Sequence, residues 1–338
     1  MNQDELTARL RLCFQLRKED KSLVDCEAYR LVNGFFEELP GLVIDRYANS
    51  IVIKNHNRQP ESQKDSVDQI VQILTNEIPE IDSILLKTRH SDDPEERKGR
   101  FLHGQTLPAE ISEHNVRYAL DLRLNQDDSF YLDTRNLRTW LRQNSQGKRV
   151  ANFFAYTGSL GIAALAGEAV EVLQTDSSGD FLALVERSQK LNRYPDTMRI
   201  WKNDYFKAVS RLKHSQALFD IVIVDAPFFS HSRFGAVDLQ SANISLINKA
   251  RPLVAHEGRM VVINNSLFVP GSQVIDEISQ MSQSGYLSLD QIIEIPPDIT
   301  GYPSSIRNAP PADPTPFNHP TKISILRITR KDQAKASF

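Results

Sequence analysis

The sequence predicts an α/β protein in which a small α+β domain precedes a doubly wound sheet of mostly parallel strands. After Asn136, apolar runs of strand length alternate with helical segments of about 10–15 residues, which is typical of parallel strands joined by right-handed crossovers. Before that point, the β-branched runs at 42–44 and 51–53 are separated only by a turn, which favours a hairpin. A chain of 338 residues also fits about two domains.

The composition excludes several classes of protein. With 40% hydrophobic and 25% charged residues and a net charge of −3, the chain is neither disordered nor a polycation. Cys13 and Cys26 are its only cysteines, which excludes a disulfide framework and a cysteine-rich zinc site. No uncharged apolar stretch approaches the ~18 residues of a membrane span, and the N-terminus has no signal core. We expect a soluble, cytoplasmic protein with no membrane partner.

Three parts are expected along the chain. Residues 1–30 form a helical segment, since Leu6, Leu10 and Cys13 recur at helical spacing on one face. Residues 31–132 form the small α+β domain. Residues 133–338 form the larger domain, with helices and strands in the following order: helix 136–144, strand 149–154, helix 161–165, strand 170–175, helix 180–191, strand 198–202, helix 206–213, strand 220–224, helix 238–253, strand 259–263, helix 273–284, strand 287–295 and strand 322–329.

The last strand, 322–329, has no helix before it and should run antiparallel to strand 287–295. Six parallel strands and one reversed strand are the architecture of a Rossmann-like, seven-stranded class I methyltransferase domain. In doubly wound sheets the ligand binds at the carboxyl ends of the strands, beside the first one. The candidate site residues therefore lie where these strands end.

Strand one ends in a turn with two glycines that allow close approach of a ligand, and its candidate cofactor contacts are Phe154, Tyr156, Thr157 and Gly158. The three-glycine dinucleotide fingerprint is missing, which argues against NAD.

Strand two ends in Asp176 and Ser177, where a carboxylate can accept hydrogen bonds from a ribose. Strand three ends in Asn203 and Asp204, where an adenine would lie. Any one such Asp could be a solvated strand end, but the series favours S-adenosylmethionine, because no phosphate-binding loop is evident.

Strand four ends in Asp225-Ala226-Pro227-Phe228-Phe229. A rigid loop with a carboxylate could position a methyl acceptor, so Asp225, Pro227 and Phe228 are the candidate catalytic residues, and Asp225 also borders the cofactor. Phe229 is a candidate substrate contact, since aromatic rings stack on planar bases. The alternative is that both rings fill the core.

These residues resemble the bacterial 23S ribosomal RNA methyltransferases of the RlmI/RlmK type. Three stretches carry the resemblance: Leu39–Tyr47 (LPGLVIDRY), Phe130–Arg138 (FYLDTRNLR) and Asn152–Gly158 (NFFAYTG). The resemblance implies that Asp176 holds the ribose and Asp204 the adenine. It also implies that Asp133 and Arg135 line the cofactor.

The chain departs from this family at several points. We do not expect the usual N-terminal PUA domain, because only the helical segment precedes the first motif. Asp127-Asp128-Ser129 replaces the Lys-Thr-Gly of many members. Methylation of cytosine at carbon-5 needs a thiolate, but the loops after strands four and five contain no cysteine. A nitrogen acceptor is therefore expected.

The loop 296–321 holds eight of the 17 prolines and is a candidate substrate lid, or else a stiff surface cover. Its candidate substrate contacts are Tyr302, Arg307, Phe317 and His319.

Residues 186–213 carry eight Lys and Arg residues against three acidic residues. Such a patch could follow a phosphate backbone or be a solvated helix face.

The sequence thus predicts an S-adenosylmethionine-dependent methyltransferase that modifies a ribosomal RNA base at a nitrogen. A methyltransferase of a small molecule or protein, or a non-catalytic protein that binds the cofactor, remains open. No metal is expected, and a homodimer is a possible assembly.

Overall fold

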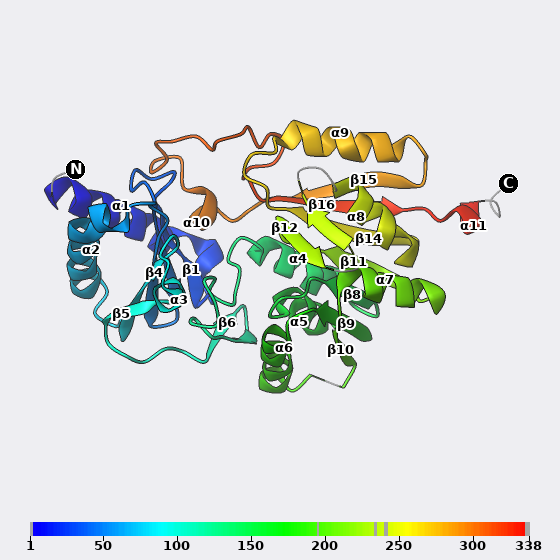
Figure 1. Ribbon diagram of the computed structural model, residues 1–338, viewed down its shortest axis with the longest axis horizontal. Helices are drawn as coiled ribbons and strands as arrows, with labels where there is room; N and C mark the ends of the chain where they lie inside the picture. Colours follow the sequence, from blue (N-terminus) through cyan, green and yellow to red (C-terminus); the bar gives the residue numbers. More distant parts are fainter. Residues whose placement is uncertain (1–2, 195, 233–234, 240–242, 335–338) are drawn as a thin grey trace. The chain divides into compact units, whose positions relative to one another are not determined.

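The computed structural model describes residues 3–194, 196–232, 235–239 and 243–334 (Figure 1). The chain divides into two compact units. The first comprises residues 1–132 and 296–309, and the second comprises residues 133–295 and 310–338. The sequence assigned all of 296–321 to the second domain, and for 296–309 that prediction is wrong.

The first unit is built on a five-stranded sheet with the order β1-β2-β3-β4-β5. All neighbours are antiparallel except β3 and β4, which are parallel because helix α2 connects them. Its elements are α1 (Gln3–Glu19), β1 (Ala28–Asn33), β2 (Leu42–Tyr47), β3 (Ser50–Asn55), α2 (Lys64–Glu77), β4 (Ser83–Thr88), α3 (Pro94–Lys98), β5 (Arg100–His103), and the hairpin of β6 (Glu110–Glu113) and β7 (Val116–Ala119).

Helix α1 packs on this sheet. Leu6, Leu10 and Cys13 are buried in the same core as residues of β1–β4 and α2. The prediction that the helical segment extends to residue 30 is wrong, because the helix ends at Glu19. The Asp20 side chain accepts a hydrogen bond from the Ser22 amide and starts a short 3-10 turn instead.

A buried ion pair attaches residues 296–309 to the first unit. Arg17 forms two hydrogen bonds to Glu37, of 2.7 and 2.9 Å, and both side chains are almost completely excluded from solvent. Arg17 also donates to the Asp298 carbonyl at 2.9 Å, while the Asp298 carboxylate accepts the Arg30 amide at 2.9 Å. Figure 1 shows the result, with helix α10 (Pro297–Thr300, orange) against β1 (blue).

The motif Asp127-Asp128-Ser129 has a structural role in the first unit. Asp128 is buried and forms ion pairs with Lys54 and Lys87, at 2.5 and 2.8 Å. Lys54 also pairs with the buried Asp45 at 2.8 Å. A buried ammonium group needs a carboxylate partner, and Asp128 supplies one to two lysines at once.

The second unit contains the predicted seven-stranded sheet, with the order β10-β9-β8-β11-β14-β16-β15. The fold class is confirmed, including the reversed strand, because β16 runs antiparallel to both β14 and β15. Its strands are β8 (Arg149–Phe153), β9 (Glu171–Asp176), β10 (Met198–Lys202), β11 (Phe219–Val224), β14 (Val254–Asn264), β15 (Leu287–Ile293) and β16 (Lys322–Ile328). Among the described residues, no helix is both long enough and apolar enough to span a bilayer.

Alternating residues of these strands bury one face of the sheet against helices. Pairs such as Phe153 with Ala151 and Val224 with Val222 face the same core as residues of α7, α8 and α9. The helices are α4 (Arg135–Asn144), α5 (Ser159–Ala166), α6 (Gly179–Asn192), α7 (Tyr205–His214), α8 (Asn243–Ala250) and α9 (Gly271–Ser282). The predicted helix 238–253 starts later than expected, because the strands β12 (Phe229–Ser232) and β13 (Gly235–Asp238) form a hairpin before it.

Replacing Arg17 by Met should destabilise the protein by about 3–5 kcal/mol, because Glu37 would remain buried without a partner charge. Urea unfolding followed by circular dichroism measures the change. The matched control is Arg11→Met, which removes the exposed pair with Glu77 and should cost about 0–1 kcal/mol. Equal losses in the two variants would contradict the importance of the buried pair.

Candidate cofactor and catalytic site

The turn after β8 is shaped by unusual backbone angles. Phe154 and Tyr156 have φ angles of 55° and 52°, and Gly158 has a φ of 81°. A Cβ atom at Gly158 would lie 2.7 Å from a Val185 methyl group, and one at Gly161 would lie 2.3 Å from the Gln174 side chain. Both positions therefore require glycine, and the backbone passes close to β9 before α5 begins.

Asp176, at the end of β9, is held by this turn. Its carboxylate accepts the backbone amide of Tyr156 at 2.9 Å and that of Ser178 at 2.9 Å. Burial raises the pKa of Asp176 although these amides act in the opposite direction. Its carbonyl accepts the Asn203 amide at 2.8 Å, which ties the ends of β9 and β10 together. Because each carboxylate oxygen can accept more than one hydrogen bond, Asp176 is able to bind a hydroxyl pair.

Asp204 has a structural role that the sequence analysis did not assign. It is the N-cap of α7, and its Oδ1 accepts the amides of Phe206 at 2.9 Å and Lys207 at 3.3 Å. Among the described residues nothing bonds to its Oδ2. The cap therefore fixes the carboxylate and leaves one oxygen available to a ligand.

Two carboxylates lie close together at the same edge of the sheet. Asp225 is half-buried after β11, and its pKa is raised to about 7 by desolvation and by the charge of Asp133. Asp133 in turn accepts a hydrogen bond from the Thr321 hydroxyl at 2.9 Å. Arg135, at the start of α4, is buried in the same unit. Near neutral pH, Asp225 is thus able to take up or release a proton.

Exposed aromatic side chains follow β11 and its parallel neighbour β14. Phe228 is 44% and Phe229 is 63% exposed, so neither ring fills the core, while Leu267 and Phe268 are 52% and 67% exposed. Parallel neighbours end at the same edge of a sheet, so both loops leave it together. Leu267 and Phe268 were not among the predicted site residues, although their place directly after strand five indicates this edge.

The predicted lid does not form one element over the site. Tyr302 and Arg307 belong to the first unit, where the Tyr302 hydroxyl donates to Asp20 at 2.6 Å. Phe317 is buried in the core of the second unit, so the prediction that it contacts substrate is wrong. His319 lies near Thr321, whose amide donates to its Nδ1 at 3.0 Å.

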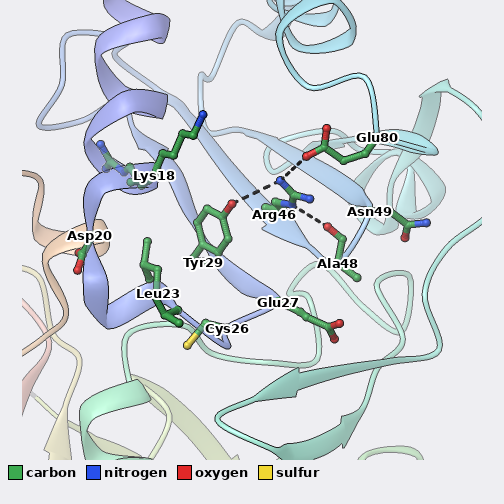
Figure 2. A pocket seen from close by; sticks show the side chains of 12 residues that line it. Lys18, Asp20, Leu23, Cys26, Glu27, Tyr29, Arg46, Ala48, Asn49 and Glu80 are labelled. Atoms are coloured by element: carbon green, nitrogen blue, oxygen red, sulfur yellow. Dashed lines mark hydrogen bonds and ion pairs between the residues drawn. The ribbon is translucent and has the colours of Figure 1, made fainter.

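The first unit has a pocket of its own, of about 680 Å³, which the sequence did not predict (Figure 2). Arg46 points toward Tyr29 and Glu80 and lies 3.4 Å from the Tyr29 hydroxyl and 3.2 Å from the Glu80 carboxylate. Cys26 is one of the lining residues, and its sulfur lies 3.5 Å from the His114 ring. The lining contains both acidic and basic side chains, which favours no single class of ligand.

Comparison with known proteins agrees with this geometry. The sequence profile of a family described as S-adenosylmethionine-dependent methyltransferase matches residues 48–304. The Ribosomal RNA large subunit methyltransferase I of Aeromonas salmonicida is 32% identical over 208 residues, which are 61% of this chain and 52% of that protein. Its Escherichia coli counterpart is 28% identical over 233 residues, which are 66% of this chain and 59% of that protein. This chain therefore matches only about half the length of these curated relatives.

The fold also matches a solved structure. A candidate SAM-dependent methyltransferase from Streptococcus mutans superposes with a TM-score of 0.82 and 20% sequence identity, over 97% of this chain and 82% of that chain. At this identity the match establishes the fold.

Replacing Asp225 by Asn should change how stability depends on pH. A carboxyl whose folded pKa is raised from 3.8 to about 7 stabilises the fold below pH 4, and this contribution disappears as the pH rises to 7. Relative to the wild type, the Asn variant should therefore gain about 2–4 kcal/mol between pH 4 and 8. Urea unfolding followed by Trp140 and Trp201 fluorescence, both in the second unit, measures it. The control is Asp180→Asn on the surface of α6, and the same pH profile in both variants would contradict the assignment.

Proposed function

The chain belongs to the S-adenosylmethionine-dependent methyltransferase family, and we propose that it transfers a methyl group to a nitrogen of a ribosomal RNA base. The observation that carries the proposal is that one loop, directly after β11, holds both Asp225 and the exposed rings of Phe228 and Phe229. This loop lies where the carboxyl ends of the parallel strands meet, which we name the cofactor edge. The names of the curated relatives support ribosomal RNA as the substrate.

The residues at the carboxyl ends of β8, β9 and β10 fit S-adenosylmethionine. Asp176 would accept the ribose hydroxyls, and the available Oδ2 of Asp204 would accept the adenine amino group. The left-handed turn at Gly158 would let the cofactor approach the backbone. The remaining contacts would come from residues around these three: Asp133, Arg135, Phe154, Tyr156, Thr157, Ser177 and Asn203. Bound there, the cofactor supplies a methyl group on a positively charged sulfur.

The loop after β11 would hold the methyl acceptor. Phe228 and Phe229 would stack on the base, and stacking of this kind contributes about 1–3 kcal/mol per base. Pro227 would keep the loop rigid, so that the acceptor nitrogen stays in line with the methyl group. Asp225 would accept a hydrogen bond from that nitrogen and take up its proton, for which a pKa of about 7 is suited.

The cysteines support a nitrogen acceptor. Carbon-5 of cytosine needs a thiolate nucleophile, but residues 133–338 contain no cysteine. Cys13 is buried in the core of the first unit, where desolvation above all, with the Glu37 charge, raises its pKa to about 12. Neither its burial nor its pKa suits a nucleophile.

The function is tested with the full chain, tritiated S-adenosylmethionine and ribosomal RNA from a strain that lacks the gene. The wild type and the double variant Cys13→Ala/Cys26→Ala should both label the RNA, and mass spectrometry of the nucleosides should find an N-methylated base. Label in protein or small-molecule fractions alone would contradict the RNA substrate. Loss of labelling in the double variant, with S-adenosylhomocysteine binding intact, would contradict the nitrogen acceptor.

The cofactor contacts are tested by calorimetry with S-adenosylhomocysteine. Asp176→Ala should weaken binding about 10- to 100-fold, because hydrogen bonds to a charged group contribute about 1.5–3 kcal/mol. For Asp204, the informative variant is Asp204→Ser, which keeps the helix cap and removes the proposed adenine contact. If Asp204→Ser binds like the wild type, the carboxylate serves only as a cap.

A further inference from the structure

The solvent-exposed side of α7 and α8 carries only positive charge. Helix α7 has the sequence YFKAVSRLKH and α8 has the sequence NISLINKA, and neither contains an acidic residue. We name the exposed cations of these two helices the α7–α8 basic face. It consists of Lys207, Arg211, Lys213 and Lys249.

Packing fixes the direction in which this face points. Ala208, Val209 and Leu212 of α7 are buried in the core of the second unit, so Lys207 and Arg211 lie on the opposite side of the helix. The two helices are joined by a hydrogen bond of 2.8 Å from the Tyr205 hydroxyl to the Leu246 carbonyl. The basic face is therefore one surface on a rigid support.

Two cations of this face lie over aromatic rings. The Arg211 guanidinium lies 4.9 Å from the Trp201 ring centroid, and the Lys249 ammonium lies 5.7 Å from that of Phe206. Among the described residues, no carboxylate forms an ion pair with Arg211, Lys213 or Lys249. Desolvation and the charge of Lys249 lower the pKa of Lys213, so two ammonium groups lie close together without a counter-charge.

Two surface cations on another part of the same unit are paired. Arg259 forms an ion pair with Asp290 at 2.6 Å, and Arg327 forms one with the same carboxylate at 3.1 Å. These residues lie on β14 and β16, toward the other edge of the sheet from β10. A carboxylate therefore compensates the charge of Arg259 and Arg327, but not that of Arg211, Lys213 and Lys249 within the described part of the chain.

The basic face begins at the cofactor edge. Helix α7 starts directly after the carboxyl end of β10, where Asp204 caps it. Its 10 residues extend about 15 Å away from that edge. A strand of nucleic acid that presents a base to Phe228 and Phe229 could therefore continue along α7.

We propose that the α7–α8 basic face binds the phosphate backbone of the substrate RNA, next to the base that is methylated. This inference rests on the proposed function, because an enzyme that methylates RNA needs a surface that binds the RNA. Phosphates would take the place of the missing carboxylates, and the contact would not depend on the RNA sequence. An anionic membrane surface could satisfy the same charges, but the continuity with the exposed rings at the cofactor edge favours RNA.

The test compares two triple variants with the same loss of charge. Arg211→Gln/Lys213→Gln/Lys249→Gln removes the basic face, and Arg259→Gln/Arg327→Gln/Arg330→Gln removes three cations that have carboxylate partners. Binding of a labelled ribosomal RNA fragment is measured by fluorescence anisotropy between 50 and 200 mM KCl. The first variant should bind about 10- to 100-fold more weakly, and its salt slope should fall by about 2–3, since each lost phosphate contact contributes about 0.7–0.9. The second variant should bind like the wild type.

A local signal separates this contact from a general effect of charge. Trp140 and Trp201 are the only tryptophans, and Trp140 lies on α4, hydrogen-bonded to Gln291 at 3.1 Å. In a Trp140→Phe background, RNA should change the fluorescence of Trp201, whose ring lies against Arg211. In a Trp201→Phe background, the fluorescence of Trp140 should stay constant.

Equal weakening in both triple variants, or no change at Trp201, would overturn the proposal. So would a first variant that binds RNA normally but loses binding to phosphatidylserine vesicles. RNA binding is measured without a methyl donor, so it can succeed while the methylation assay fails, which would refute only the proposed function. If the wild type binds no RNA but still binds S-adenosylhomocysteine, the chain is a methyltransferase fold with another acceptor and the basic face has no RNA role.

Discussion

The arrangement of the second unit depends on the position of β8 between β9 and β11. Strand β8 pairs in parallel with both neighbours. The chain builds outward from β8 to β9 and β10, and then crosses back to β11 on the other side of β8. The carboxyl ends of the strands then meet at one edge with a gap between the helices that follow them. Asp176, Asp204 and Asp225 lie at this edge because of the strand order, although they are far apart in the sequence.

The edge also brings together groups with different surroundings. Asp176 is restrained by backbone amides, Asp204 by its role as a helix cap, and Asp225 by burial beside Asp133. Three chemically identical side chains thus differ in the groups that hold them in place, and burial beside Asp133 raises the pKa of Asp225 to about 7. Environment, and not residue type, separates the two proposed cofactor ligands from the proposed proton acceptor.

Much of this could be predicted from the sequence, because strand ends and glycines leave local signals. The alternation after Asn136 and the helix-free approach to Lys322 were sufficient for the order and direction of the strands. The burial of Phe317 could not be predicted, because nothing in a proline-rich loop distinguishes a ring that fills the core from one that contacts substrate. Nor could the ion pair of Arg17 with Glu37, which depends on contacts with Asp298, 281 positions further along the chain. The cap at Asp204 does leave a local signal, because an Asp directly before a helix is a favoured N-cap.

The attachment of residues 296–309 to the first unit has a consequence for how the protein is made. The chain passes from the first unit to the second at residue 132, returns at 296 and leaves again at 309. Arg17 is synthesised 281 residues before Asp298, which completes the surroundings of the ion pair. Domains usually fold in order from the N-terminus during synthesis, at about 5–20 residues per second. Here the first unit must wait until residues 133–295 of the second have been translated, so its buried ion pair stays incomplete during that time, while the nascent chain is exposed to chaperones and proteases.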